Sequence, residues 1–168
     1  NNVITANVGE LKPTDDGGGG IGCREATPLI INNLITGNRA TRGAGINVFG
    51  YSFPTIGNNV IVSNVVESAT SVGVLKGGAA VCVQFSSAIV RNNVIAYNIA
   101  TNVGAGRAYG GGLCLISSFG PRYPDLVQIV NNTFLHNQAS NGSTSETVEN
   151  GGAIYCRAIN LVIANNLI

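Results

Sequence analysis

Short apolar segments alternate with asparagine and glycine along the whole chain, and their order recurs. The most regular segment is an Asn-Asn pair that opens a short apolar stretch, and it occurs six times, at 1–4, 32–35, 58–61, 92–95, 131–134 and 165–168. Another asparagine follows three residues after each of the first five, at Asn7, Asn38, Asn64, Asn98 and Asn137. Spacings of 26 to 39 residues between successive pairs identify an internal repeat.

Two more apolar segments separate successive Asn-Asn pairs. One includes a run of glycine and alanine, at 18–23, 43–48, 77–82, 110–115 and 151–156. The other directly precedes the next pair, at 29–31, 55–56, 88–90, 127–130 and 161–163. Short runs of Val, Ile and Leu bounded by Gly and Asn are typical of β-strands. The sequence therefore predicts three strands per repeat, with a loop of variable length after the third asparagine.

Turn residues that recur while loop lengths vary predict a solenoid, because each coil must turn at the same corner as its neighbour. Strands stacked at ~4.8 Å then give an all-β fold, a right-handed parallel β-helix. We expect a single domain over residues 1–168, with about five coils at 1–31, 32–57, 58–91, 92–130 and 131–164 and a partial coil at 165–168. The ends are expected to lack caps, and the missing initiator methionine indicates a processed product or a piece of a longer chain.

Alternation along the strands assigns three inward walls. The first contains Ile4, Ile35, Ile61, Ile95, Phe134 and Ile168. The second contains Ile21, Ile46, Ala80, Leu113 and Ile154, with Cys23, Val48, Cys82, Leu115 and Cys156 two residues further on. The third contains Ile30, Ile56, Val90, Ile129 and Ile163.

The corner and the outer face follow from the same alignment. Asparagine tolerates left-handed backbone angles and can hydrogen-bond its copy in the next coil. A structural corner is therefore expected at Asn2, Asn33, Asn59, Asn93, Asn132 and Asn166. Outward positions beside it form an apolar column, which predicts an assembly face covered by a loop or by another molecule. This column contains Val3, Leu34, Val60, Val94, Thr133 and Leu167.

Composition removes several classes of function. The net charge is +1 without a basic run, which argues against a nucleic-acid partner. An apolar content of 45% excludes intrinsic disorder, and no uncharged apolar run is long enough to span a membrane. The glycines at 17–22 formally match a phosphate-binding loop, but a short strand follows them where a helix would be needed. No cofactor and no metal are therefore expected.

The repeats resemble the Gly-Gly-Gly-Ile and Asn-Asn-x-Ile-x-x-Asn pattern of right-handed β-helix repeat proteins, which are secreted or lie on cell surfaces. The segments 151–154 and 134–137 are also similar to the paired Gly-Gly-Ala-Ile and Phe-x-x-Asn motifs of polymorphic outer-membrane autotransporters. The resemblance covers the whole chain and implies the fold. It leaves the function open, because the same coil carries adhesins, fibres, polysaccharide lyases and pectinolytic hydrolases.

Candidate catalytic residues are few. The carboxylates of Glu10, Asp15 and Asp16 lie close together in sequence, and they form the alternative enzyme site. They fall in the first variable loop. No carboxylate recurs in a strand column, so no acid from another coil is placed beside them. A solvated turn is therefore the simpler interpretation. The only histidine, His136, lies in a corner column that the alignment treats as tolerant of any residue, and no partner residue is assigned to it.

Cysteines, arginines and glycosylation sequons receive structural interpretations. Cys23, Cys82 and Cys156 are expected to be buried free thiols of the core, whereas Cys114 is expected to face outward. Arg24 and Arg157 occupy equivalent columns and are interpreted as separate surface charges. Sequons occur at Asn131 and Asn141, and the sequence leaves their glycosylation open.

The favoured function is an extracellular structural or adhesive β-solenoid that associates with itself end to end or continues as a longer solenoid. A polysaccharide or a cell-surface molecule is a further possible partner. The alternative is part of a carbohydrate-active β-helix enzyme, a polysaccharide lyase or a glycoside hydrolase. Ice binding would require regular outward threonine ranks, of which only Thr5 and Thr36 align.

Overall fold

The computed structural model of the chain is built from β-strands, and none of the residues that it describes lies in a helix. Those residues are 1–9, 18–68, 76–102, 108–117, 126–141, 151–157 and 159–168. All strand pairs within this part of the chain are parallel.

Three sheets contain five strands each, and successive strands come from successive repeats of the sequence. The first sheet, which follows the Asn-Asn pairs, contains β1 (Val3–Thr5), β4 (Leu34–Thr36), β8 (Val60–Val62), β13 (Val94–Ala96) and β18 (Thr133–Leu135). The second, which follows the glycine blocks, contains β2 (Ile21–Arg24), β6 (Ile46–Phe49), β11 (Val81–Gln84), β16 (Leu113–Ile116) and β20 (Ile154–Arg157). The third contains β3 (Leu29–Ile31), β7 (Thr55–Gly57), β12 (Ala88–Arg91), β17 (Leu126–Val130) and β21 (Asn160–Ala164).

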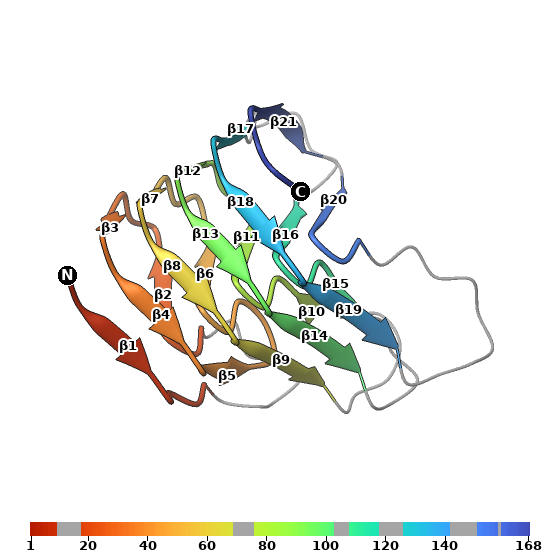
Figure 1. Cartoon of the computed structure of the whole chain (residues 1–168). Helices are drawn as coiled ribbons and strands as arrows, with labels where there is room; N and C mark the ends of the chain where they lie inside the picture. The colour runs from red at the N-terminus through yellow and green to blue at the C-terminus, as the bar shows by residue number, and fades with distance from the viewer. Residues whose placement is uncertain (10–17, 69–75, 103–107, 118–125, 142–150, 158) are drawn as a thin grey trace.

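Each strand pairs with its counterparts in the neighbouring repeats. Ile61 of β8, for example, lies in register between Ile35 of β4 and Ile95 of β13. Figure 1 shows the strands of the first sheet side by side, in chain order from β1 to β18. Parallel strands require a crossover between them, and here the strands of the other sheets supply it. This arrangement of stacked parallel sheets is compatible with the predicted parallel β-solenoid.

A fourth sheet shows that the expectation of three strands per repeat was wrong. It contains β5 (Arg39–Ala40), β9 (Val65–Ser68), β14 (Ile99–Asn102) and β19 (Gln138–Asn141), and a short pair is formed by β10 (Lys76–Gly77) and β15 (Ala108–Tyr109). The inward side chains here are small, because Ala40, Val66 and Ala100 fill a separate cluster with other alanines. Alanine among polar residues gives no clear alternation, so the sequence pattern resembles a loop.

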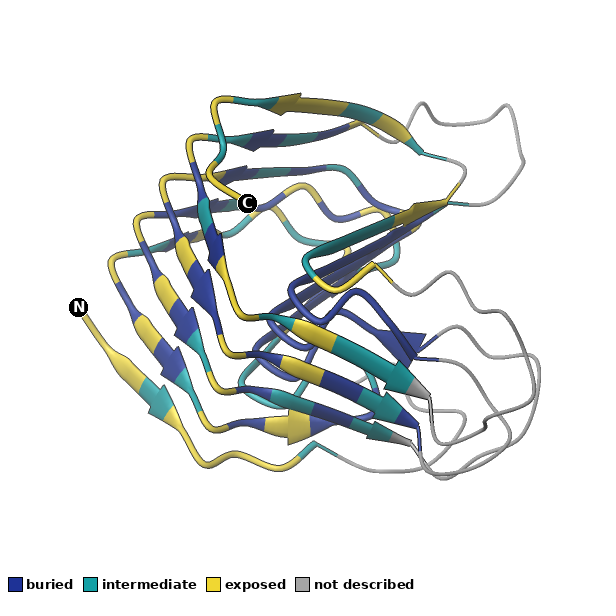
Figure 2. Cartoon of the chain, turned by 45° about the vertical axis from the view of Figure 1, so that its right-hand side comes forward, coloured by how far each residue is buried: buried dark blue, intermediate teal, exposed yellow. Residues whose placement is uncertain are grey.

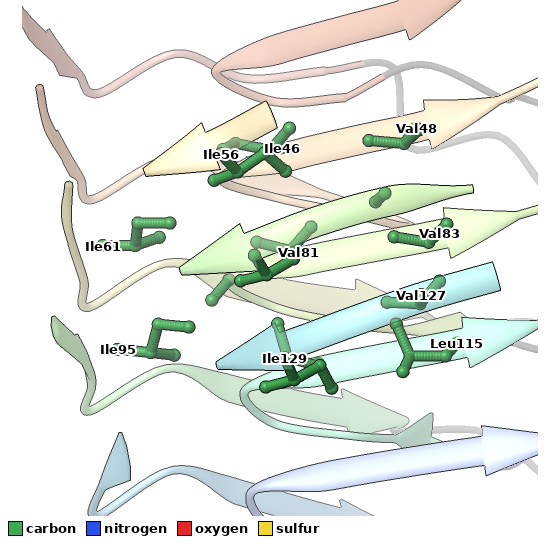
Figure 3. Close-up of a cluster of buried hydrophobic side chains, with 14 of the residues drawn as sticks. Ile46, Val48, Ile56, Ile61, Val81, Val83, Ile95, Leu115, Val127 and Ile129 are labelled. Atoms are coloured by element: carbon green, nitrogen blue, oxygen red, sulfur yellow. The ribbon is translucent and has the colours of Figure 1, made fainter. Parts of the chain in front are cut away.

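The main core is aliphatic and follows the predicted first and third walls. Ile35, Ile61 and Ile95 are fully buried in one column, with Phe134 beside them in register. The column of Ile56, Val90 and Ile129 faces them from the third sheet. Figure 3 shows Ile61 and Ile95 of the first column and Ile56 and Ile129 of the third sheet, together with Val48, Val83 and Leu115 of the second sheet. Ile168 departs from the predicted wall, because it is 68% exposed.

The second wall differs from the prediction by one residue in a single repeat. Val81 and Val83 face the core, in register with Ile46 and Val48, where Ala80 and Cys82 had been expected. The cause is the turn that precedes β11. Gly78 has a φ of +64°, and a Cβ there would lie 2.3 Å from the carbonyl oxygen of Val81. The turn therefore begins at Gly78 and not at Gly77, which shifts the following strand by one position.

The core column predicts the result of truncating one buried side chain. Ile95→Ala should lower the free energy of unfolding by about 2–5 kcal/mol, because it leaves a cavity between Ile61 and Phe134. Chemical denaturation followed by circular dichroism measures this change. The matched control is Val94→Ala on the same strand, where the side chain is 39% exposed and the cost should stay below about 1 kcal/mol. Equal effects of the two substitutions would contradict the assignment of inward and outward faces.

Candidate functional site

A continuous ladder of asparagine side chains crosses the first sheet at the points where its strands begin. In each step the Nδ2 amide donates a hydrogen bond to the Oδ1 oxygen of the asparagine one repeat later, over 3.0 to 3.1 Å. The residues of this ladder are Asn2, Asn33, Asn59, Asn93, Asn132 and Asn166. The structure thus brings all six corner asparagines of the sequence analysis into one array.

The buried carboxamides of this ladder bond in more than one direction. The Oδ1 oxygen of Asn93 accepts from both the backbone N–H and the Nδ2 amide of Asn59. Its own Nδ2 amide donates to the Oδ1 oxygen of Asn132 and to the carbonyl oxygen of Ile56. Asn93 is only 1% exposed, so these bonds replace the water that its amide would otherwise bind.

A second asparagine ladder crosses the first sheet just beyond the points where its strands end. Its Nδ2 to Oδ1 distances are 2.9 to 3.0 Å, and its members are Asn7, Asn38, Asn64, Asn98 and Asn137. The recurring third asparagine of the sequence is its signal. Two ladders therefore fix the first sheet on both sides.

The residue directly before a ladder asparagine has a left-handed backbone, with a positive φ, at ten positions. At the first ladder these residues are asparagines, with φ between 54° and 59°: Asn32, Asn58, Asn92, Asn131 and Asn165. At the second ladder φ lies between 51° and 64°, at Ala6, Gly37, Ser63, Tyr97 and His136. The repeat alignment predicts that this second column tolerates any residue. That was wrong for the backbone, because positive φ is unfavourable for most side chains.

The outer face of the first sheet is an exposed aliphatic column. Leu34, Val60 and Val94 are between 37% and 41% exposed, and they lie in one register column. Val3 and Leu167 extend this column and are more exposed, whereas Thr133 is half-buried. Figure 2 shows exposed and buried segments alternating along these strands. We call these six residues the aliphatic face.

The stacked rings of Tyr97 and His136 lie at the corner beside this face. Their centroids are 5.2 Å apart, with an angle of 25° between the ring planes. Both residues are exposed and belong to neighbouring repeats. His136 therefore stacks on the ring of Tyr97.

The second sheet differs, because the outer side of its central strands β11 and β16 is covered. Cys82 and Cys114 point away from the core in adjacent strands, yet both are fully buried. They form a cluster with Tyr109 and Ile116, and the ring of Tyr155 lies 4.3 Å from that of Tyr109. A hydrogen bond with Cys82, together with burial, raises the pKa of the Cys114 thiol well above its usual value.

The cysteine interpretation needs three corrections. Cys82 lies on the outer side and not in the core, because of the one-residue shift described above. Cys114 faces outward as expected but is covered. Cys156 is exposed, although it had been expected to be buried. All four cysteines lie within the described part of the chain and are free thiols.

A cationic pair near this cluster was not anticipated. Lys76 is 2% exposed, and burial lowers the pKa of its ammonium group, with a further lowering by the charge of Arg42. Arg42 donates from Nη1 to the Oε1 oxygen of Gln84 over 3.4 Å. The sequence carried no clear signal for this, since a lone lysine before a glycine block is ordinarily a surface residue.

The remaining candidates either lie outside the described residues or belong to separate strands. Glu10, Asp15 and Asp16 lie outside the described residues, as do the carboxylates of Asp125, Glu146 and Glu149. Arg24 and Arg157 share a column of the second sheet but belong to its first and last strands, and Arg24 pairs with the neighbouring Glu25. Among the residues that the structure describes, no three His, Cys, Asp or Glu side chains are grouped to hold a metal.

Within the same residues, no helix has the length and apolar content that crossing a bilayer requires. Comparison of the chain with protein-family models, with curated proteins and with solved structures finds no match.

The first ladder predicts a large cost for removing one carboxamide. Asn93→Ala should destabilise the protein by at least about 2 kcal/mol, because Asn59 and Asn132 lose buried hydrogen-bond partners. Thermal and chemical denaturation measure the loss. The control is Asn92→Gly, which keeps the positive φ of 56° accessible and should change stability by less than about 1 kcal/mol. A mild effect of Asn93→Ala would show that the ladder does not hold the corner.

The thiols predict a selective pattern of alkylation. In the native protein only Cys156 should react quickly with iodoacetamide, because Cys23, Cys82 and Cys114 are buried. Burial also raises the pKa of the Cys23 thiol, which keeps it protonated and unreactive. Mass spectrometry of the labelled peptides checks this, and Cys156→Ser should remove the fast reaction. Equally fast labelling of Cys114 would show that the outer side of the second sheet is open.

Proposed function

We propose that this chain is an extracellular structural or adhesive segment, built as a right-handed parallel β-helix. About five coils at a rise of ~4.8 Å would give a rod of roughly 24 Å. The right hand is favoured because crossover connections between parallel strands of one sheet are almost always right-handed. The extracellular location rests on the resemblance to secreted and cell-surface β-helix repeat proteins.

The observation that carries this proposal is the pair of buried asparagine ladders beside an open aliphatic face. The ladders repeat the same corner in every repeat, so the side chains outside them are held in a regular array. A rigid array of Leu34, Val60 and Val94 suits contact with another surface, because these side chains lose little conformational freedom on binding. Structural support and adhesion both use such a face.

The outermost strands provide a second contact, along the axis of the stack. In the third sheet β21 is the last strand, and its Ile163 is 49% exposed although Ile129, one repeat earlier, is fully buried. A further repeat placed against β21 would cover Ile163 and extend the strand pairing. That repeat can come from the same polypeptide or from a second copy, whose contact would then be head to tail.

The stacking proposal predicts assembly of the purified chain. Sedimentation velocity over a wide concentration series should show rods that lengthen with concentration, and electron microscopy should show end-to-end particles. Ile163→Glu should stop this growth, because it places a charge in the apolar stack. The matched control is Val162→Glu on the same strand, which is 47% exposed and points to the outer side.

Two results would contradict the stacking proposal. One is a compact monomer at every concentration. The other is growth that Val162→Glu reduces as strongly as Ile163→Glu. The aliphatic face is tested in the same images, where Val60→Lys combined with Val94→Lys should remove side-by-side contacts and leave lengthwise growth intact.

A further inference from the structure

We infer that the corner between the second and third sheets binds an extended, neutral polysaccharide. Four aromatic residues meet there, and we call them the aromatic corner: Phe49, Tyr51, Phe53 and Phe85. The chain has only five Tyr, five Phe and no Trp, so this corner holds four of its ten aromatic side chains. The site lies at a different corner from the aliphatic face, so it goes beyond the proposed function.

A backbone contact places Tyr51 next to Phe85, and Phe49 and Phe53 lie two residues before and two residues after Tyr51 in the chain. The N–H of Tyr51 donates to the carbonyl oxygen of Phe85 in the next repeat over 2.9 Å. The N–H of Phe53 donates over 2.9 Å to Ala26 in the preceding repeat. Phe49 pairs in register with Arg24, whose guanidinium carbon lies 5.8 Å from the centre of the Phe49 ring.

The fold does not require aromatic side chains at this corner. Three of the four residues are solvent-exposed, at 68% for Tyr51, 49% for Phe53 and 43% for Phe85, whereas Phe49 is half-buried. The core is aliphatic and is complete without them. Their exposure therefore has no explanation in the packing of the described residues.

The backbone at this corner even opposes aromatic residues. Tyr51 has a φ of +64° and Phe85 a φ of +47°, a region that favours Gly and Asn. At two other corners of the repeat those residues are present, as in Asn58 and Gly78. A bulky ring held in a left-handed conformation points to a role for the ring itself, because the turn alone would be better served by glycine.

The chemistry of the corner fits a sugar chain. Exposed aromatic faces stack against the apolar C–H faces of pyranose rings, and charged side chains bond the hydroxyl groups between them. The backbones of Tyr51 and Phe85 lie one repeat apart, at the ~4.8 Å strand spacing, and rings carried at this interval would match the length of about one hexose in an extended chain. Arg24 and Glu25 flank the rings and supply both donors and acceptors.

The charge of the corner favours a neutral ligand. Arg24 pairs with Glu25 through Nε and Oε1 over 3.3 Å, so the cation beside the rings is balanced by a carboxylate. A polyanion would have to compete with Glu25 for Arg24.

Calorimetric titration of the whole chain with cellohexaose, mannohexaose and chitohexaose tests the inference. At least one should bind with a millimolar or tighter dissociation constant. Combining Tyr51→Gly with Phe85→Gly should weaken binding by about tenfold or more. Glycine fits both positive φ values, so the melting temperature should stay the same or rise.

The matched control is Tyr97→Gly, which removes another exposed aromatic ring from a left-handed position at a different corner. It should leave sugar binding unchanged. The inference is overturned if none of the three oligosaccharides binds or if Tyr97→Gly weakens binding as much as the double variant. Tighter binding of hexagalacturonate than of the neutral sugars would also overturn it. Because monomers suffice for the titration, its outcome does not depend on stacking.

Discussion

The hydrogen-bonding requirement of a buried carboxamide is the constraint on which this structure depends. An asparagine inside a protein must replace its lost water partners, and in each ladder the replacement is its own copy one repeat away. The copy must sit at the same height and in the same orientation. The register of the first sheet therefore follows from the ladders, and the core columns behind it follow from that register.

At the corners beside the ladders the fold requires a particular backbone conformation but not a particular side chain. The residue before a ladder asparagine has a positive φ at ten positions. The side chain of that residue points out of the stack and is exposed. The second ladder accepts Ala6, Ser63 and Tyr97 at this position, all with φ of 56°. Because the backbone is fixed and the side chain is free, these corners can carry function at a small cost in stability.

The sheets also differ in what covers them. The outer side of β8 and β13 exposes Val60 and Val94, whereas the outer side of β11 and β16 buries Cys82 and Cys114 beside Tyr109. One scaffold therefore presents an open aliphatic surface and a closed, thiol-containing one. A contact surface is expected on the open side, since apolar side chains there gain from being covered.

The sequence by itself determined the repeat, the asparagine corner, two of the three core walls and the outward column of Leu34, Val60 and Val94. Those features depend on strand alternation and on contacts between identical residues, which a repeat displays directly. Only the tertiary structure decided the rest. The shift to Val81 depended on where a left-handed glycine begins a turn. The burial of Cys114 and Lys76, and the meeting of Tyr51 with Phe85, depended on which segments pack together across repeats, and no local pattern encodes such contacts.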